Sequence, residues 1–211
     1  MTFEKLKQNY IDQLLAAKAL LVRSVDEEPF TLRSGRKSCM FFDHSLLSIR
    51  PEGFRAFIDV ISALVTDTFG DQESILCNVD SKISAQMVGA VAYNLKLSQI
   101  IYKSSALVAA EKGTARQMTG DKNWDRPVAI LDDVMTGGDG TAKGVADLIK
   151  ESFPKIKEIH IFVGFTREIK PSTYPSHHVI TQNELLTQAW DTLSKGQQQA
   201  IEKELQTRVI K

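Results

Sequence analysis

Residues 128–143 have the sequence VAILDDVMTGGDGTAK. The first four residues are apolar, a run that is too short for a helix and typical of a buried parallel strand. Two carboxylates, Asp132 and Asp133, follow directly, and a glycine-rich segment comes after them. Helical periodicity resumes at Ala142. The order of strand, acidic turn, glycine-rich loop and helix predicts one βα unit of a parallel sheet.

The glycine-rich segment is a candidate phosphate site. Glycines permit positive φ and close backbone approach, so several amides can point at one spot beside the positive end of the next helix. The acidic pair suits hydroxyl donors or a metal, because carboxylates repel a phosphate. A phosphate on one side and a diol on the other describes a ribose 5-phosphate. The alternative is an ordinary strand–helix turn with a solvated acidic pair.

Alternating strands and helices extend from this unit in both directions, which predicts an α/β fold with a central parallel sheet flanked by helices. Ligands of such sheets bind at the carboxyl ends of the strands. The further strands are expected at residues 73–79, 97–102 and 157–165, and the helices at residues 2–22, 51–69, 83–95 and 181–211. Residues 171–178 are expected to form a loop, and Gly196 is expected to split the last helix.

Composition excludes several classes of protein. The chain has 211 residues, of which 43% are hydrophobic, enough for one sizeable core. Lys plus Arg equals Asp plus Glu at 26 each, and no basic run occurs, so there is no signal for nucleic acid. The charged N-terminus does not resemble a signal peptide, and no apolar run reaches the roughly 20 residues of a membrane span.

The cysteines and histidines predict neither a disulfide framework nor a metal site. Cys39 and Cys77 are too few for either, and we expect both to be reduced, in a cytoplasmic protein. His177 and His178 have no obvious third ligand and are expected to face solvent.

The stretch at residues 128–143 resembles the phosphoribosyl diphosphate (PRPP) binding motif of type I phosphoribosyltransferases. In that family an apolar strand precedes two acids, two apolar residues, Thr, a small residue and Gly. The matching residues are Asp132, Asp133, Thr136, Gly137 and Gly138. The resemblance implies that the acids hold the ribose hydroxyls, whereas residues 136–141, including Gly140, hold the 5-phosphate. The family usually has a hydroxyl where this chain has Asp139, and Thr141 can supply one instead.

Residues 30–43 have the sequence FTLRSGRKSCMFFD, a basic turn beside aromatic residues. Composition alone allows either a surface hairpin with solvated cations or a site for a flat anionic ring. The pattern FTLxSGxxSxxFF is similar to the N-terminal hood of orotate phosphoribosyltransferases. The resemblance implies that Arg33 lies near the phosphoribosyl group and the pyrimidine, and that Phe41 and Phe42 line the orotate site.

Arg167 follows the strand expected at residues 157–165. In the orotate enzymes an Arg at this place binds the orotate carboxylate with help from the Thr of the PRPP motif, here Thr136. A planar guanidinium suits a bidentate contact with a carboxylate. Without the resemblance, a surface Arg would be the ordinary interpretation.

The pyrophosphate of PRPP is held in this family by a loop after one strand and by a mobile basic loop after another. Lys82 matches a lysine of the first loop, and Lys103 matches the strand-end lysine of the second. The long polar segment at residues 104–126 is expected to be the mobile loop. Its second half, GTARQMTG, resembles the family, which makes Lys112 and Arg116 candidates for its remaining cations.

The resemblance covers nearly the whole chain and implies an orotate phosphoribosyltransferase. The expected reaction transfers ribose 5-phosphate from PRPP to orotate, with Mg²⁺ bound mainly through PRPP, in a homodimer. A single domain is expected over residues 1–211. It comprises an N-terminal helix and hood (1–50), an α/β core (51–170) and a C-terminal helical segment (171–211).

Two alternatives stay open. Asp80, Ala106 and Asp139 replace residues that favour anion binding in the family, so a ligand-binding relative with impaired catalysis is the second hypothesis. A phosphoribosyltransferase that acts on another base is the third.

Overall fold

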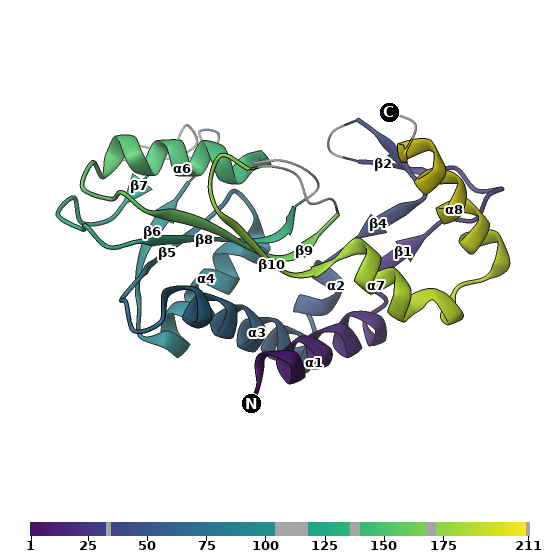
Figure 1. Cartoon of the computed structure of the whole chain (residues 1–211), viewed down its shortest axis with the longest axis horizontal. Coiled ribbons are helices and arrows are strands. Elements are labelled where there is room, and N and C mark those ends of the chain that lie inside the picture. The colour runs from purple at the N-terminus through teal and green to yellow at the C-terminus, as the bar shows by residue number, and fades with distance from the viewer. Residues whose placement is uncertain (33–34, 104–117, 136–139, 168–171, 210–211) are drawn as a thin grey trace.

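The elements expected on either side of residues 128–143 form one six-stranded sheet (Figure 1). The computed structural model describes residues 1–32, 35–103, 118–135, 140–167 and 172–209. In sheet order the strands are β10 (Ser176–Thr181), β9 (Ile159–Thr166), β8 (Val128–Met135), β5 (Ile75–Asn78), β6 (Ser98–Tyr102) and β7 (Met118–Thr119). Neighbours are parallel except for β6 and β7. The predicted α/β class with a mostly parallel central sheet is confirmed.

Helices cover both faces of the sheet (Figure 1). One face packs against α1 (Phe3–Ala16), α3 (Pro51–Phe69) and α4 (Lys82–Leu95), and the other against α6 (Gly140–Ser152). Successive side chains of a strand point to opposite faces, so each strand contributes to two cores. In β8, Ala129 and Leu131 belong to the cluster under α3, whereas Val128 and Ile130 belong to the cluster under α6.

A second unit, which we call the hood, stands beside the sheet (Figure 1). It contains β1 (Leu20–Val22), β2 (Phe30–Thr31), β3 (Lys37–Ser38), β4 (Met40–Phe42), α7 (Gln182–Ala189), η1 (Trp190–Thr192) and α8 (Lys195–Val209). β1 pairs with β4 and β2 pairs with β3, both antiparallel. Met40, Leu186 and Ile201 form its small buried cluster. The hood therefore joins the two ends of the chain.

The N-terminal helix is shorter than predicted. α1 ends at Ala16, and Lys18 then adopts a positive φ of 53°. This left-handed residue turns the chain away from the helix axis. The residues that follow form β1, whose pairing with β4 overrides the helical spacing of the sequence. Expecting one helix over residues 2–22 was therefore wrong at its last third.

The expected loop at residues 171–178 was also wrong in its last part, because β10 begins at Ser176 and pairs with β9. His177 and His178 lie on this strand and are half-buried rather than solvated. The His177 ring stacks on Phe162 with centroids 4.7 Å apart, and its Nε2 is 2.8 Å from His160 Nδ1. A histidine can thus fill an apolar position at the edge of a sheet.

The C-terminal tail breaks at residues 193–194, before α8, and not at Gly196. Gly196 lies within α8, where a Cβ atom would come within 2.1 Å of Ser24 Oγ. The glycine permits close approach of α8 to the segment after β1.

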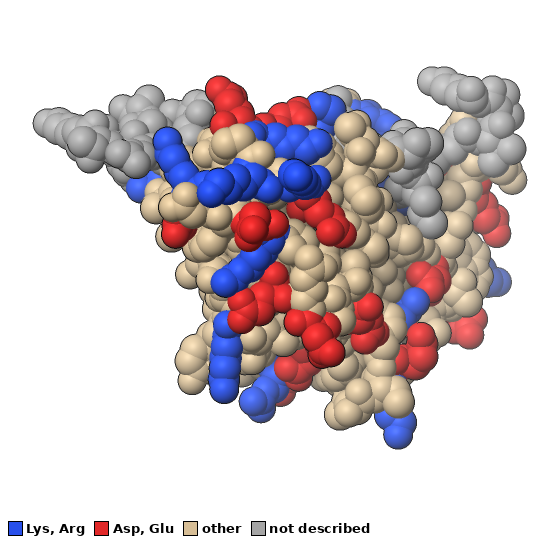
Figure 2. Space-filling model, turned by 60° about the vertical axis from the view of Figure 1, so that its left-hand side comes forward, with Lys and Arg blue, Asp and Glu red and all other residues tan. Residues whose placement is uncertain are grey.

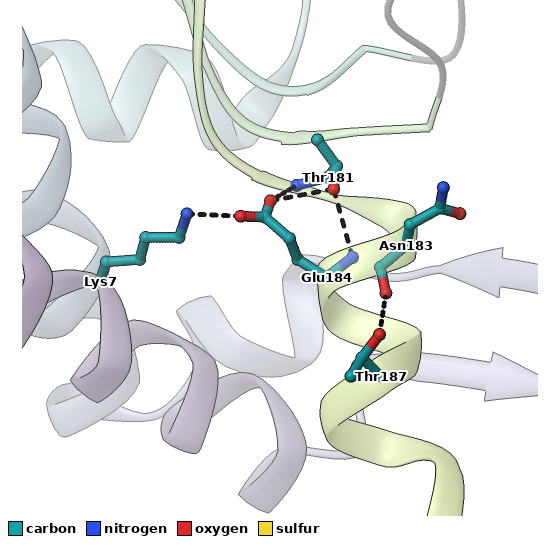
Figure 3. A network of polar contacts seen from close by, with 5 residues as sticks. All are labelled: Lys7, Thr181, Asn183, Glu184 and Thr187. Carbon is teal, nitrogen blue, oxygen red and sulfur yellow. Dashed lines mark hydrogen bonds and ion pairs between the residues drawn. The ribbon is translucent and has the colours of Figure 1, made fainter.

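The start of α7 is tied to α1 by polar contacts (Figure 3). Thr181 and Glu184 form a capping box, in which Thr181 Oγ1 accepts from Glu184 N and the Glu184 carboxylate accepts from Thr181 N. The other carboxylate oxygen of Glu184 lies 2.7 Å from Lys7 Nζ. This contact joins residues 177 positions apart in the chain.

Candidate active site

The acidic pair lies at the carboxyl end of β8. Asp132 and Asp133 are partly exposed, and the strand continues through them to Met135. The Asp133 backbone N–H donates to Asp132 Oδ1 at 2.9 Å, which keeps the Asp132 carboxylate beside the main chain. The strand is longer than the one predicted from the four apolar residues of the sequence, because Val134 and Met135 still pair with β9.

Two serines at the start of α4 hold this part of the sheet together. Ser81 caps α4 by accepting from Ser84 N, and its hydroxyl donates to Asp133 Oδ1 at 3.3 Å. Ser84 is fully buried, accepts from Val79 N at 2.9 Å and donates to the Leu131 carbonyl. Ser81 was missing from the predicted site, although a serine before a helical pattern is a recognisable cap signal.

A buried polar pair lies within the electrostatic influence of Asp133. The Tyr10 hydroxyl is 3.1 Å from His44 Nε2, and both residues are at most 2% exposed. Burial lowers the pKa of His44 to about 4, although the nearby Asp133 charge acts in the opposite direction. Burial also raises the pKa of Tyr10, and Asp133 adds to that effect. Both groups are therefore neutral near pH 7.

Gly164 on β9 makes room for this pair. A Cβ at Gly164 would lie 2.7 Å from the Tyr10 hydroxyl, 2.6 Å from Phe57 and 3.2 Å from the Asp133 carbonyl oxygen. The glycine lets α1 and α3 pack directly against the strand next to the acidic pair.

The helix that follows the glycine-rich segment begins at Gly140, and Thr141 in its first turn is exposed. The predicted phosphate-binding residues Thr136, Gly137, Gly138 and Asp139 lie outside the described residues, as do Arg33, Lys112 and Arg116. A helix N-terminus at this place provides a partial positive charge within reach of a phosphate in the loop.

The next two strands of the sheet, β5 and β6, end at the same edge as β8. Lys82 is the first residue of α4 and Lys103 directly follows β6. Asn78 joins the ends of β5 and β6, since its Nδ2 donates to the Tyr102 carbonyl and its Oδ1 accepts from Tyr102 N, both at 3.0 Å. Asp80 is exposed in the loop before α4. Its charge contributes to raising the pKa of Tyr102, after the larger effect of burial.

The two adjacent aromatic residues of β4 point in opposite directions. Phe42 is 7% exposed and stacks on Phe165 with ring centroids 4.1 Å apart. Phe41 is 36% exposed and lies 5.6 Å from the ring of Phe30. The alternation of a strand explains the difference. Phe41 is therefore the ring that a ligand can reach, whereas Phe42 belongs to the core.

Arg167 lies directly after β9 and is 6% exposed. Its Nη1 donates to Ser38 Oγ at 2.9 Å and its Nη2 donates to the Met40 carbonyl at 2.8 Å. The backbone N–H of Arg167 donates to Met135 O at 2.9 Å, which fixes it to the end of β8. The guanidinium thus joins the carboxyl edge of the sheet to the hood.

These contacts bring the acidic pair, the start of α6, Lys103 and Arg167 to one edge of the sheet, where strand ends of α/β folds bind ligands. Figure 2 shows Lys and Arg side chains interspersed with Asp and Glu side chains over one face of the molecule. Within the described part of the chain, no helix is both long and apolar enough to cross a membrane.

No protein-family model matches the chain. It is similar to the orotate phosphoribosyltransferase of Methanothermobacter thermautotrophicus, with 29% identity over 124 residues. This match covers 57% of the chain and 62% of that relative, which is less than two thirds of its length. The orotate phosphoribosyltransferase of Methanosphaera stadtmanae is 28% identical over 137 residues, which cover 64% of the chain and 71% of the relative.

Solved structures match over most of the chain. UMP synthase of Leishmania donovani superposes with a TM-score of 0.72 at 15% identity and covers 94% of this chain and 42% of its own. Orotate phosphoribosyltransferase of Francisella tularensis superposes with a TM-score of 0.66 at 17% identity, and the match covers 94% of this chain and 98% of that protein. At these identities the likeness establishes the fold.

Proposed function

We propose that this chain, which has the type I phosphoribosyltransferase fold, transfers ribose 5-phosphate from PRPP to orotate and so makes orotidine 5′-monophosphate and pyrophosphate. One observation carries the proposal. Asp132 and Asp133 lie partly exposed near the carboxyl end of the central strand β8, which ends at Met135, and a helix that begins at Gly140 follows. Carboxylates for a diol and a helix N-terminus for a phosphate then stand at the two ends of one loop.

The acidic pair would hold the ribose hydroxyls. Displacement of pyrophosphate at the anomeric carbon passes through a cation-like sugar, and nearby carboxylates stabilise its positive charge. Ser81 orients Asp133 by its hydrogen bond, and Asp132 is kept beside the main chain. Residues 136–139 with Gly140 and Thr141 would hold the 5-phosphate.

The departing pyrophosphate gains negative charge, so preorganised cations lower the barrier. Lys82 and Lys103 would serve at the strand ends, and Lys112 or Arg116 from the long segment. The described residues contain no group of three side chains suited to hold a metal ion. Two carboxylates suit a hard cation that keeps its other oxygens from substrate and water, so Mg²⁺ would arrive with PRPP and neutralise pyrophosphate charge.

Orotate would lie between the hood and the sheet edge. Arg167 would bind its carboxylate with Thr136, Phe41 would contact its ring, and Arg33 would lie near both substrates. Phe42 would support the site from the core, by its stacking on Phe165. We further propose a homodimer in the cytoplasm, in which the long basic segment serves the neighbouring site.

The test is orotate consumption, followed by ultraviolet absorbance, with purified protein, PRPP and Mg²⁺. The double variant Asp132→Asn/Asp133→Asn is expected to lose turnover. Asp67→Asn/Asp71→Asn removes two exposed carboxylates at the end of α3 and is expected to keep it. Equal loss of turnover in both variants, or equal retention of turnover, would contradict the assignment of Asp132 and Asp133 to the active site.

A binding protein without turnover is the second candidate, favoured by the exposed carboxylate of Asp80 in the loop before α4. A negative charge there repels pyrophosphate. Calorimetry decides between the two candidates: binding of PRPP or orotate by folded protein without turnover would establish the binding protein. Burial of Phe42 also justifies a panel of other bases, since turnover of one of them in place of orotate would establish the third hypothesis.

A further inference from the structure

Within the hood, one face of α8 packs against β1, β3 and β4 through residues spaced by four and three positions. Gln197 Nε2 donates to the Val22 carbonyl at 2.8 Å, and Ile201 is fully buried against Met40. Glu204 is next on the same face and contacts the residues around β3. Helical geometry places these three side chains in one row. The row ends at Glu204, beside residues that contact Arg167.

The Glu204 carboxylate is held by two donors from the hood. Its oxygens lie 2.9 and 3.0 Å from Ser38 Oγ, and one of them accepts from Cys39 N at 2.7 Å. Ser38 is only 2% exposed and Glu204 is half-buried, so these charge-assisted bonds are partly shielded from solvent. Residues 166 positions apart in the chain are joined in this way.

Glu204 determines what the Ser38 hydroxyl offers to its other neighbours. A hydroxyl has one hydrogen and two lone pairs. Because a carboxylate accepts only, the hydrogen of Ser38 must point to Glu204. Its lone pairs then accept from Arg167 Nη1 at 2.9 Å and from Met40 N at 3.1 Å. The Met40 carbonyl accepts from Arg167 Nη2.

We propose that Glu204 is a positioning residue for Arg167, acting through Ser38, and so sets the affinity of the site for an acidic base. The inference rests on the proposed function of Arg167 as the group that binds the substrate carboxylate. A guanidinium with its plane fixed loses less side-chain entropy on binding a carboxylate. Without Glu204 the Ser38 hydroxyl is free to turn its hydrogen toward Arg167, and one of the contacts that orient the guanidinium is weakened.

The experiment compares steady-state kinetics of Glu204→Ala, Glu204→Gln and the control Glu202→Gln with those of the unchanged chain. Glu202 is an exposed glutamate on the same helix, outside the docked row. Glu204→Ala is expected to raise the KM for orotate about tenfold, the effect of losing one charge-assisted contact, with the KM for PRPP within about twofold. Glu204→Gln keeps an acceptor oxygen, so its KM for orotate is expected to lie between those of Glu204→Ala and the unchanged chain. The KM for orotate of Glu202→Gln is expected to match that of the unchanged chain.

Ser38→Ala tests the route. Because Glu204 acts through Ser38, the double variant Ser38→Ala/Glu204→Ala is expected to raise the KM for orotate no more than the larger single effect. Calorimetry then measures the affinity for orotate of variants whose thermal unfolding shows that they are folded at the assay temperature. A lower affinity in these folded variants indicates loss of positioning and not general loss of structure.

Each outcome decides. Absence of orotate turnover and binding in the unchanged chain overturns the proposed function, and this inference with it. With the unchanged chain active, an unaltered KM for orotate in Glu204→Ala overturns the inference alone. Tighter orotate binding in Glu204→Ala also overturns it, because Glu204 would then compete with the substrate. Equal increases in both KM values would make Glu204 a general structural residue.

Discussion

At the level of single residues, Ser81 connects structure to chemistry most directly. It caps α4 and also hydrogen-bonds Asp133. Ser81→Ala is expected to lower the free energy of unfolding by about 1 kcal/mol, the cost of an N-cap. It is also expected to raise the KM for PRPP, because the Asp133 carboxylate loses a donor that orients it.

Thr181→Ala is the matched control for Ser81→Ala. It removes an N-cap from α7 at the end of β10, which β9 separates from the acidic pair on β8. Urea unfolding should show a similar loss of stability in both variants, whereas kinetics should show a raised KM for PRPP in Ser81→Ala only. A raised KM in both variants would mean that stability, and not orientation of Asp133, causes the effect.

His44 predicts how stability depends on pH. Its pKa is about 4 in the folded protein against an ordinary 6.5, so the unfolded chain binds a proton more readily. The free energy of unfolding therefore has its full value above about pH 6.5 and decreases as the pH falls towards 4. The difference of about 2.5 pKa units corresponds to roughly 3 kcal/mol.

Urea unfolding between pH 4 and 7.5 measures how the free energy of unfolding depends on pH, and His44→Gln is the comparison. The variant is expected to be less stable at pH 7.5 and to lose less stability on acidification. His177 and His178 also have lowered pKa values, but they titrate in both proteins. The same slope in both proteins would remove His44 as the cause.

At the level of elements, the contact of β9 with α1 and α3 depends on Gly164. Gly164→Ala would push its new methyl group into Tyr10 and Phe57, both fully buried. Overpacking of this kind costs about 1–3 kcal/mol. We also expect lower activity, because the third close atom is the Asp133 carbonyl oxygen.

Gly144→Ala in α6 is the control, since a Cβ atom added at this position would have no other atom within 4 Å. It is expected to raise stability by up to about 1 kcal/mol, as an exposed helical glycine replaced by alanine does. Thermal unfolding of the two variants checks the pair, and destabilisation of both would contradict the packing argument.

The elements also show how far the sequence predicts this molecule. Hydrophobic period and turn residues placed α3 at its observed limits and β5, β6, β8 and β9 within two residues at their starts, because those signals are local. β1, β7 and β10 were missed, since pairing with β4, β6 and β9 overrides weak local preference, and β7 lies within the long loop expected at residues 104–126. In the candidate site the acidic pair and Arg167 were predicted from motifs. The contacts of Tyr10 with His44 and of Ser38 with Glu204 were not, because they join distant positions without a local pattern.

At the level of the whole molecule, the sheet and the hood are expected to differ in local stability. β8 has two parallel partners and lies between two cores, whereas β1 pairs with β4 alone. Two-stranded ribbons are marginally stable unless other elements cover them. Native-state hydrogen exchange should therefore show faster opening at β1 and β4 than at β8 and β9. Equal protection would mean that sheet and hood unfold as one unit.

The joining of the chain's two ends in the hood affects how the protein is made. β1 and β4 leave the ribosome before Leu186, Ile201 and Glu204, which cover or hold them. The α/β core can assemble during translation, but the apolar face around Met40 stays uncovered until residues 186–204 have been made. We expect the nascent chain to depend on chaperones mainly over this interval, and the hood to be the last part to fold.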